Sequence, residues 1–210
     1  LLAHGLSEPL HRVLPPVIRP DILVTGDGLA VTEIDAVPGG IGLTAYLNRL
    51  YEGDFDSLVG SGRGMVEGFL AAVAGAEAVH RNPYIAITVS DEAETYRPEM
   101  EWLASELQRL GKRVFVHNPG ELMPLGDSLC VGVEGNPQKV DIVYRFFELF
   151  DLPNLGIRTY IHGFVEKELV RLAPPMKHFQ EEKLNLGLFH HPRLEAFWTE
   201  NLSKASRKCL

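Results

Sequence analysis

Residues 84–117 constrain the fold more than any other part of the sequence. Residues 84–89 (Tyr-Ile-Ala-Ile-Thr-Val) form an almost continuous apolar run, which is typical of a strand buried on both faces of a parallel sheet. Pro98 suits the first turn of a following helix, and Gly111 suits its end. Apolar residues at helical spacing predict the buried face of that helix: Met100, Leu103, Leu107 and Leu110. With a second strand at 113–117, the segment predicts a βαβ unit with a right-handed crossover.

The rest of the first three quarters of the chain extends this α/β pattern. Residues 21–35 predict a β-hairpin, because Asp27-Gly28 supplies a positive-φ turn and β-branched residues flank it. Helices are predicted at 43–51 and 65–79, and two more strands at 129–133 and 140–144. We therefore expect a three-layer α/β domain with a mostly parallel sheet.

Beyond Phe146 the pattern becomes helical. Apolar spacing predicts helices at 160–172, 179–189 and 192–206. The Pro174-Pro175 pair is the best candidate boundary, since it interrupts regular structure. It divides the chain into an α/β domain at 1–173 and a helical extension at 174–210.

Charge and composition exclude several classes of function. The net charge of -8 argues against nucleic acid as a partner, because phosphate binding needs clustered cations. No apolar run approaches the roughly 20 residues of a membrane helix, so we expect no membrane partner. The two cysteines, Cys130 and Cys209, define no disulfide framework, and a cytoplasmic location is the expected setting.

Carboxylates and glycines meet at the end of the predicted hairpin. Glu33 and Asp35 are two residues apart on a strand, so both side chains point to the same face. Gly39 and Gly40 follow in a loop that precedes a helix, where backbone amides without partners bind anions. This pattern suits a zwitterionic ligand, with its ammonium on the acids and its anion on the amides. The alternative is a solvated acidic strand end followed by a capping turn.

Three other features favour structural interpretations or leave the choice open. The glycines at 60, 62 and 64 depart from the dinucleotide fingerprint, and a loop that caps the next helix is favoured. Asp141 and Arg145 lie in a very apolar run, which predicts a charge partner, either a ligand or a structural ion pair. The histidines lack metal-binding spacing, so no metal site is predicted.

Three short segments, in this order, resemble one family. Residues 19–21 (Arg-Pro-Asp) and 31–40 (Val-Thr-Glu-Ile-Asp-Ala-Val-Pro-Gly-Gly) resemble the start of the pre-ATP-grasp domain of glutathionylspermidine synthase-like proteins. Residues 140–145 are similar to a later strand of that family, and residues 175–183 to its entry into the ATP-grasp module. The resemblance implies a Rossmann-like pre-ATP-grasp domain in an ATP-dependent ligase. Such enzymes join a carboxylate to an amine or thiol with ATP and Mg²⁺ through an acyl-phosphate.

The resemblance also implies roles for individual residues. The substrate, a small molecule with amine and carboxylate groups, would be bound by Arg19, Asp21, Glu33, Asp35, Gly39, Gly40 and Arg145. Lys183 would approach the ATP phosphates. Asp35 stands where the family commonly has Asn, which replaces a donor and acceptor by an acceptor only and points to a different substrate.

The later ATP-binding elements of the family are expected outside residues 1–210. The chain is therefore expected to bind substrate without catalysing the reaction alone. The alternative function is a non-catalytic, Rossmann-like module that binds small amino-acid-like molecules. A ligase predicts ATP turnover by the complete machinery, whereas a binding module predicts stabilisation by amino-acid-like ligands and none by ATP.

Overall fold

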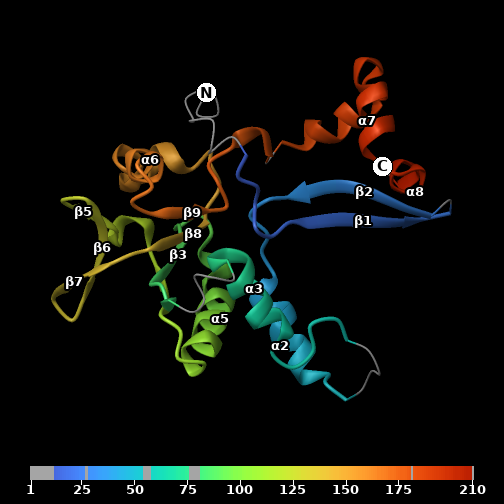
Figure 1. The fold of residues 1–210 in the computed structure, drawn as a ribbon. Helices are drawn as coiled ribbons and strands as arrows, with labels where there is room; N and C mark the ends of the chain where they lie inside the picture. The colour runs from blue at the N-terminus through green and yellow to red at the C-terminus, as the bar shows by residue number, and fades with distance from the viewer. Residues whose placement is uncertain (1–11, 27, 54–57, 76–80, 181, 210) are drawn as a thin grey trace.

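A four-stranded parallel sheet lies at the centre of the protein. The computed structural model describes residues 12–26, 28–53, 58–75, 81–180 and 182–209. The strand order is β4-β3-β8-β9 (Figure 1). Its strands are β3 (Ile85–Val89), β4 (Val114–His117), β8 (Ile142–Phe146) and β9 (Arg171–Ala173). Every residue of β3 is buried and both of its neighbours are parallel to it, which confirms the interior parallel strand predicted at 84–89.

Three helices pack together against this sheet. They are α2 (Ile41–Leu50), α3 (Gly64–Ala74) and α5 (Arg97–Arg109), and Figure 1 shows them grouped below the strands. Helix α5 connects β3 to β4 and carries Pro98 in its first turn, as predicted. Its buried residues are Met100, Leu103, Ala104 and Leu107. Leu110, predicted to continue this face, is instead the residue that ends the helix and is only half-buried.

A second apolar cluster joins the sheet to a different set of elements. They are η4 (Leu152–Asn154), η5 (Gly156–Thr159), α6 (Ile161–Glu166) and an antiparallel sheet of β5 (Met123–Leu125), β6 (Ser128–Val133) and β7 (Asn136–Lys139). Successive side chains of β3 point to opposite faces of the sheet. Ile85 and Ile87 therefore pack in the cluster that contains the helices α2, α3 and α5, and Ala86 packs in the second cluster.

The structure corrects one predicted helix and confirms two predicted strands, β6 (predicted at 129–133) and β8 (predicted at 140–144). The helix predicted at 160–172 ends at Glu166, and the last part of that range becomes strand β9. The apolar residues there were compatible with either period, and pairing with β8 decides the outcome. The strands predicted at 129–133 and 140–144 belong to different sheets, because β7 intervenes and pairs with β6. Pro137 is tolerated in β7 because that strand lies at a sheet edge.

The predicted hairpin is present and extends away from the parallel sheet (Figure 1). Its strands β1 (Arg19–Thr25) and β2 (Gly28–Asp35) form a two-stranded antiparallel sheet. Gly28 has a φ of 129°, which fits a turn glycine, whereas the predicted turn residue Asp27 lies outside the described residues. The distal part of the helix predicted at 65–79 also falls outside them.

The C-terminal region consists of short helical turns. These are η6 (His178–Gln180), η7 (Lys183–His190), η8 (Pro192–Leu194), α7 (Glu195–Asn201) and α8 (Lys204–Cys209). The α-helix predicted at 179–189 is therefore 3₁₀ in geometry; it contains Asn185 and Gly187, which are weak α-helix formers. Within the described ranges, no helix has the length and apolar character needed to cross a membrane.

Candidate functional site

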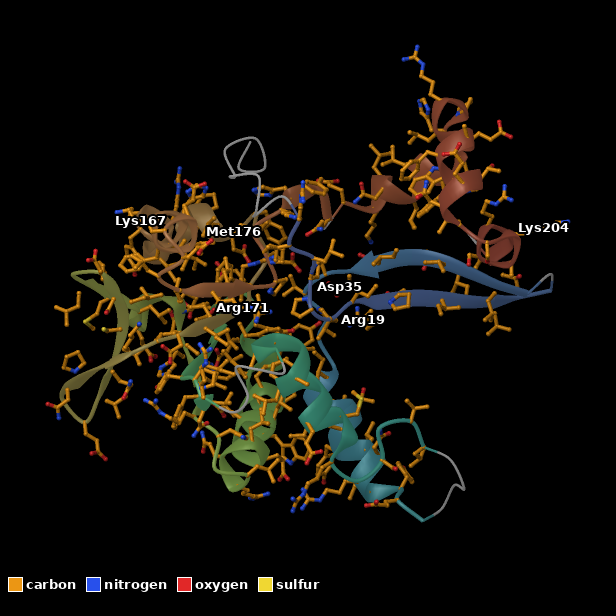
Figure 2. The ribbon with its side chains drawn as sticks, viewed as in Figure 1. Arg19, Asp35, Lys167, Arg171, Met176 and Lys204 are labelled. Atoms are coloured by element: carbon orange, nitrogen blue, oxygen red, sulfur yellow. The ribbon has the colours of Figure 1, made fainter. Side chains whose placement is uncertain are left out.

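Four charged side chains lie together at the base of the hairpin. The strand register places Arg19 opposite Asp35, and Asp21 opposite Glu33. Residues directly opposite each other in an antiparallel pair lie on the same face, and alternation puts both pairs on one face. Figure 2 shows Arg19 and Asp35 at the end of the hairpin that joins the rest of the protein. The structure thus brings together the two sequence segments that the hairpin turn separates.

Arg19 connects this cluster to the glycine loop. Its guanidinium Nη2 lies 3.2 Å from Asp35 Oδ2, and its Nε lies 3.2 Å from Asp21 Oδ1. Its Nη1 donates a hydrogen bond of 3.1 Å to the carbonyl oxygen of Gly39. Asp35 Oδ1 also accepts from the amide of Val37 at 2.8 Å. Arg19 therefore holds both strand ends and the following loop in one arrangement.

Lys183 joins the cluster from the other end of the sequence. Its Nζ lies 2.9 Å from Glu33 Oε2, and the hydrogen bond that it donates to Glu33 raises the pKa of Lys183. The Lys183 side chain is 70% exposed, so this contact lies in solvent and adds little stability by itself. The contact matters for the position of Lys183. It places the lysine that is predicted to approach the ATP phosphates beside a residue that is predicted to bind the substrate.

The cluster has an excess of negative charge. Asp21, Glu33 and Asp35 supply three carboxylates, whereas Arg19 and Lys183 supply two cations, which leaves one net negative charge. A cationic group that approaches this face is attracted, and carboxylates are the strongest acceptors for an ammonium. The local charge therefore favours an amine as part of any ligand.

The amides of the glycine loop are occupied by a side chain that the sequence did not reveal. Glu99, in the first turn of α5, accepts hydrogen bonds from the amides of Gly40 at 2.7 Å and Leu43 at 3.0 Å. The start of α2 thus binds a carboxylate. Amides without intrahelical partners and the helix dipole both favour a negative charge at this position. That carboxylate comes from the protein itself. The only sequence signal for Glu99 was an acid in a first helical turn, which does not identify a distant partner.

Close packing explains why glycines stand in this loop. A Cβ at Gly39 would lie 2.5 Å from the Tyr96 ring, and a Cβ at Gly42 would overlap the carbonyl oxygen of Glu99. Gly40 has a φ of 86°, a conformation that other residues rarely adopt. The loop brings α2 onto the start of α5, and the amides of Gly40 and Leu43 contact a ligand only if Glu99 moves away.

Arg145 lies in the interior of the parallel sheet. It is fully buried in β8, and its guanidinium donates to the carbonyl oxygens of Phe147 and Pro175 and lies over the Phe147 ring. Asp141, the other charge of this run, accepts from the amide of Tyr84 at 2.9 Å. Asp141 Oδ1 also lies 3.9 Å from Lys139 Nζ, so Asp141 has a charged partner as well as a backbone donor, and the contacts of Arg145 join β8 to the segment after β9.

An apolar pocket adjoins the charged cluster. It has a volume of about 380 Å³ and lies between the hairpin base and the C-terminal turns. Apolar and aromatic side chains from both ends of the chain line it: Ile18, Ile34, Phe179, Phe189 and Trp198. Lys183 also lines the pocket, so its ammonium group links the apolar space to Glu33. Sequence patterns did not reveal this pocket because its walls are far apart along the chain.

A buried tyrosine, Tyr144, belongs to strand β8 of the parallel sheet. Burial raises the pKa of Tyr144; Arg145 opposes this shift, and the carboxylates of Asp35 and Glu99 add to it. Within the described part of the chain, the Tyr144 hydroxyl has no hydrogen-bond partner.

Substitution of Tyr144 by phenylalanine tests this environment. Since its pKa is raised in the folded state, Tyr144 contributes stability that is present below pH about 10 and is lost as pH rises above it. Tyr144→Phe is expected to change stability at pH 7 by less than about 1 kcal/mol, because no hydrogen bond is lost. Urea unfolding at pH 7 to 11 should show a shallower alkaline decline than the wild type. An unchanged decline would contradict this environment.

The described residues contain no cluster of three or more His, Cys, Asp or Glu side chains suited to a metal ion. The carboxylates of the hairpin base are directed to Arg19 and Lys183 instead. No protein-family model matches the chain, and comparison with curated proteins finds no match.

Proposed function

We propose that this chain is the substrate-binding part of an ATP-dependent carboxylate–amine or thiol ligase of the ATP-grasp superfamily. The observation that carries the proposal is the contact between Lys183 and Glu33. It joins the first and last of the segments that resemble glutathionylspermidine synthase-like proteins, although they lie at opposite ends of the sequence. The second segment, which contains Arg145, is placed in the sheet interior and supports the fold rather than the site.

The proposed substrate carries an amine, a carboxylate and an apolar portion. Its ammonium group approaches Asp21 and Glu33, where the cluster has excess negative charge. Its carboxylate is countered by Lys183, whose exposed side chain can turn toward the ligand. The neighbouring apolar pocket takes the remainder of the molecule and supplies the hydrophobic part of the affinity.

The finer description of the fold belongs to the same proposal. We propose a Rossmann-like, three-layer pre-ATP-grasp domain at 1–173 and the start of the ATP-grasp module at 174–210. The parallel sheet and the two apolar clusters separated along β3 support the domain. ATP and Mg²⁺ are required by this chemistry, but the described carboxylates do not fit a Mg²⁺ site, so we assign no step through the metal to them.

One observation favours the alternative of a non-catalytic binding module. Glu99 fills the helix start that resembles an anion site, and Glu33 pairs with the lysine predicted to approach phosphates. Both features reduce the number of groups available to a nucleotide. A module of this kind would bind amino-acid-like molecules at the same hairpin base without chemistry.

A matched set of small molecules tests the proposed site. Phenylalanine has an amine, a carboxylate and a ring; phenethylamine lacks the carboxylate, and phenylpropionate lacks the amine. We expect phenylalanine and phenethylamine to raise the melting temperature of the chain and phenylpropionate to have little effect. Broader pools of amino acids and diamines then identify stronger ligands. No stabilisation by any amine would contradict a substrate site.

ATP turnover separates the two functions. A ligase that contains this chain is expected to release ADP only when a stabilising amine and a second substrate are both supplied with ATP and Mg²⁺. Release of ADP that depends on the amine supports the ligase. Stabilisation by the amine without such release supports the binding module.

A further inference from the structure

A second pocket lies away from the hairpin and is surrounded by arginines. It has a volume of about 260 Å³ and is formed where the ends of α2 and α5 meet the glycine loop that leads into α3. Three of its lining residues are arginines from these three segments: Arg49, Arg63 and Arg109. The chain as a whole has a net charge of -8, so a concave site with three guanidinium groups runs against its overall charge.

Glu106 orients two of the three guanidinium groups. Its Oε2 lies 2.7 Å from Arg49 Nη1, and its Oε1 contacts Arg109. The Glu106 side chain is only 14% exposed, whereas both arginines are more than half exposed. Each guanidinium carries five N–H donors, so the contact with one carboxylate leaves donors on each arginine for another acceptor. The pairing therefore places the two arginines without saturating them.

Arg63 is the third cation of this pocket, and its side chain is exposed. Among the residues that the structure describes, none forms an ion pair or hydrogen bond with this guanidinium. Counted together, Arg49, Arg63 and Arg109 against Glu106 give two net positive charges. The exposed Glu52 also lines the pocket and lowers this to one while its carboxylate faces inward.

A glycine loop at 60–64 forms one wall of this pocket, at Gly62 and Arg63. Helix α3 begins after Arg63 with no side-chain cap, and the amides of Gly64 and Met65 donate to the carbonyl oxygens of Ser61 and Gly60. Gly60 and Gly62 have φ values of 75° and 60°, a conformation that other residues rarely adopt. Sequence analysis predicted a capping loop here, and the structure places cations around it.

We propose that this pocket binds the phosphate group of a small phosphorylated molecule. Guanidinium groups match the oxygens of phosphate with paired hydrogen bonds, and a phosphate monoester carries close to two negative charges at neutral pH. The three guanidinium groups outnumber the two carboxylates of Glu106 and Glu52, so the pocket keeps a net positive charge that attracts this anion. A carboxylate has one charge and needs one guanidinium fork, so three arginines favour the phosphate. The site is independent of the hairpin base and of the ligase proposal.

Trp102 supplies a direct readout, because it lines this pocket. Trp198→Phe leaves Trp102 as the remaining tryptophan, since the chain has two. In this background, fluorescence is measured during titration with inorganic phosphate and glycerol phosphate, and with chloride and succinate at equal ionic strength. We expect a saturable change with both phosphates and only a weak, linear one with chloride and succinate. Binding should be stronger at pH 7.5 than at pH 5, since the second phosphate pKa is about 6.

Arg63→Gln is the decisive variant, because it removes a charge without breaking an ion pair. We expect it to weaken phosphate binding about tenfold, which corresponds to one charge-assisted hydrogen bond. Arg158→Gln, an exposed substitution on η5, makes the same charge change elsewhere and should leave binding unaltered. Two results would overturn the proposal, because they would show only the screening of charge by counter-ions. One is an equal loss of phosphate affinity in the two variants, and the other is a fluorescence response to succinate or chloride equal to that to phosphate.

Discussion

Replacement of Arg145 by alanine is expected to destabilise the protein by about 3–5 kcal/mol. The substitution leaves the carbonyl oxygens of Phe147 and Pro175 without this donor in a buried region and opens a cavity beside the Phe147 ring. Each unsatisfied buried polar group costs about 1–3 kcal/mol, and the lost packing adds to this. Urea unfolding of the whole chain measures the effect.

Two further variants identify its cause. Arg158→Ala removes an exposed arginine from η5 and should change stability by less than about 0.5 kcal/mol. Arg145→Lys keeps the charge but loses the planar fork, so we expect it to recover only part of the loss. If Arg145→Ala unfolded at the wild-type urea concentration but lost the binding of phenylalanine, whose carboxylate suits a guanidinium, the substrate role implied by the family resemblance would hold instead.

Gly42→Ala is expected to destabilise the protein by about 1–3 kcal/mol. The added Cβ overlaps the carbonyl oxygen of Glu99, a backbone atom that moves only if α2 and α5 separate. Separation also lengthens the hydrogen bonds from Gly40 and Leu43 to Glu99. Intrinsic helix propensity favours alanine over glycine, so a destabilisation here reports the contact between the helices.

Gly68→Ala is the matched control for this prediction. Gly68 is also helical, in α3, and a Cβ there meets nothing within 4 Å. We expect this change to stabilise the protein by up to about 1 kcal/mol, opposite in sign to Gly42→Ala. The same sign for both variants in urea unfolding would contradict the close approach of α2 and α5.

The parts of the fold predicted from sequence are those fixed by local pattern. The buried run at 84–89, the helix begun by Pro98 and the hairpin around Gly28 each have a strong period or turn residue. Strand β9 was missed because three residues at a sheet edge have too little pattern to distinguish strand from helix. Its pairing with β8 is a tertiary contact that local sequence does not encode.

Part of the candidate site followed from the hairpin register, and Arg19 and Lys183 were implied by the family resemblance. Once a hairpin is predicted, alternation brings Glu33 and Asp35 onto one face, and the structure places Arg19, which the family resemblance had implied, opposite Asp35. The carboxylate of Glu99 on the glycine loop depends on how two helices pack, so sequence gave no basis for it. The same holds for the burial of Arg145, where a charge in an apolar run was compatible with a ligand or with structure.

Titration of the chain with phenylalanine and phenethylamine by isothermal calorimetry tests the proposed site most directly. Glu33→Gln removes a carboxylate that faces Lys183 while keeping the shape of the side chain. Glu166→Gln makes the same change at an exposed position at the end of α6. We predict saturable binding of the amines by the wild type and by Glu166→Gln, and binding weaker by about tenfold or more in Glu33→Gln. Equal affinity in all three proteins, or no binding by the wild type, would contradict a ligand site at the hairpin base.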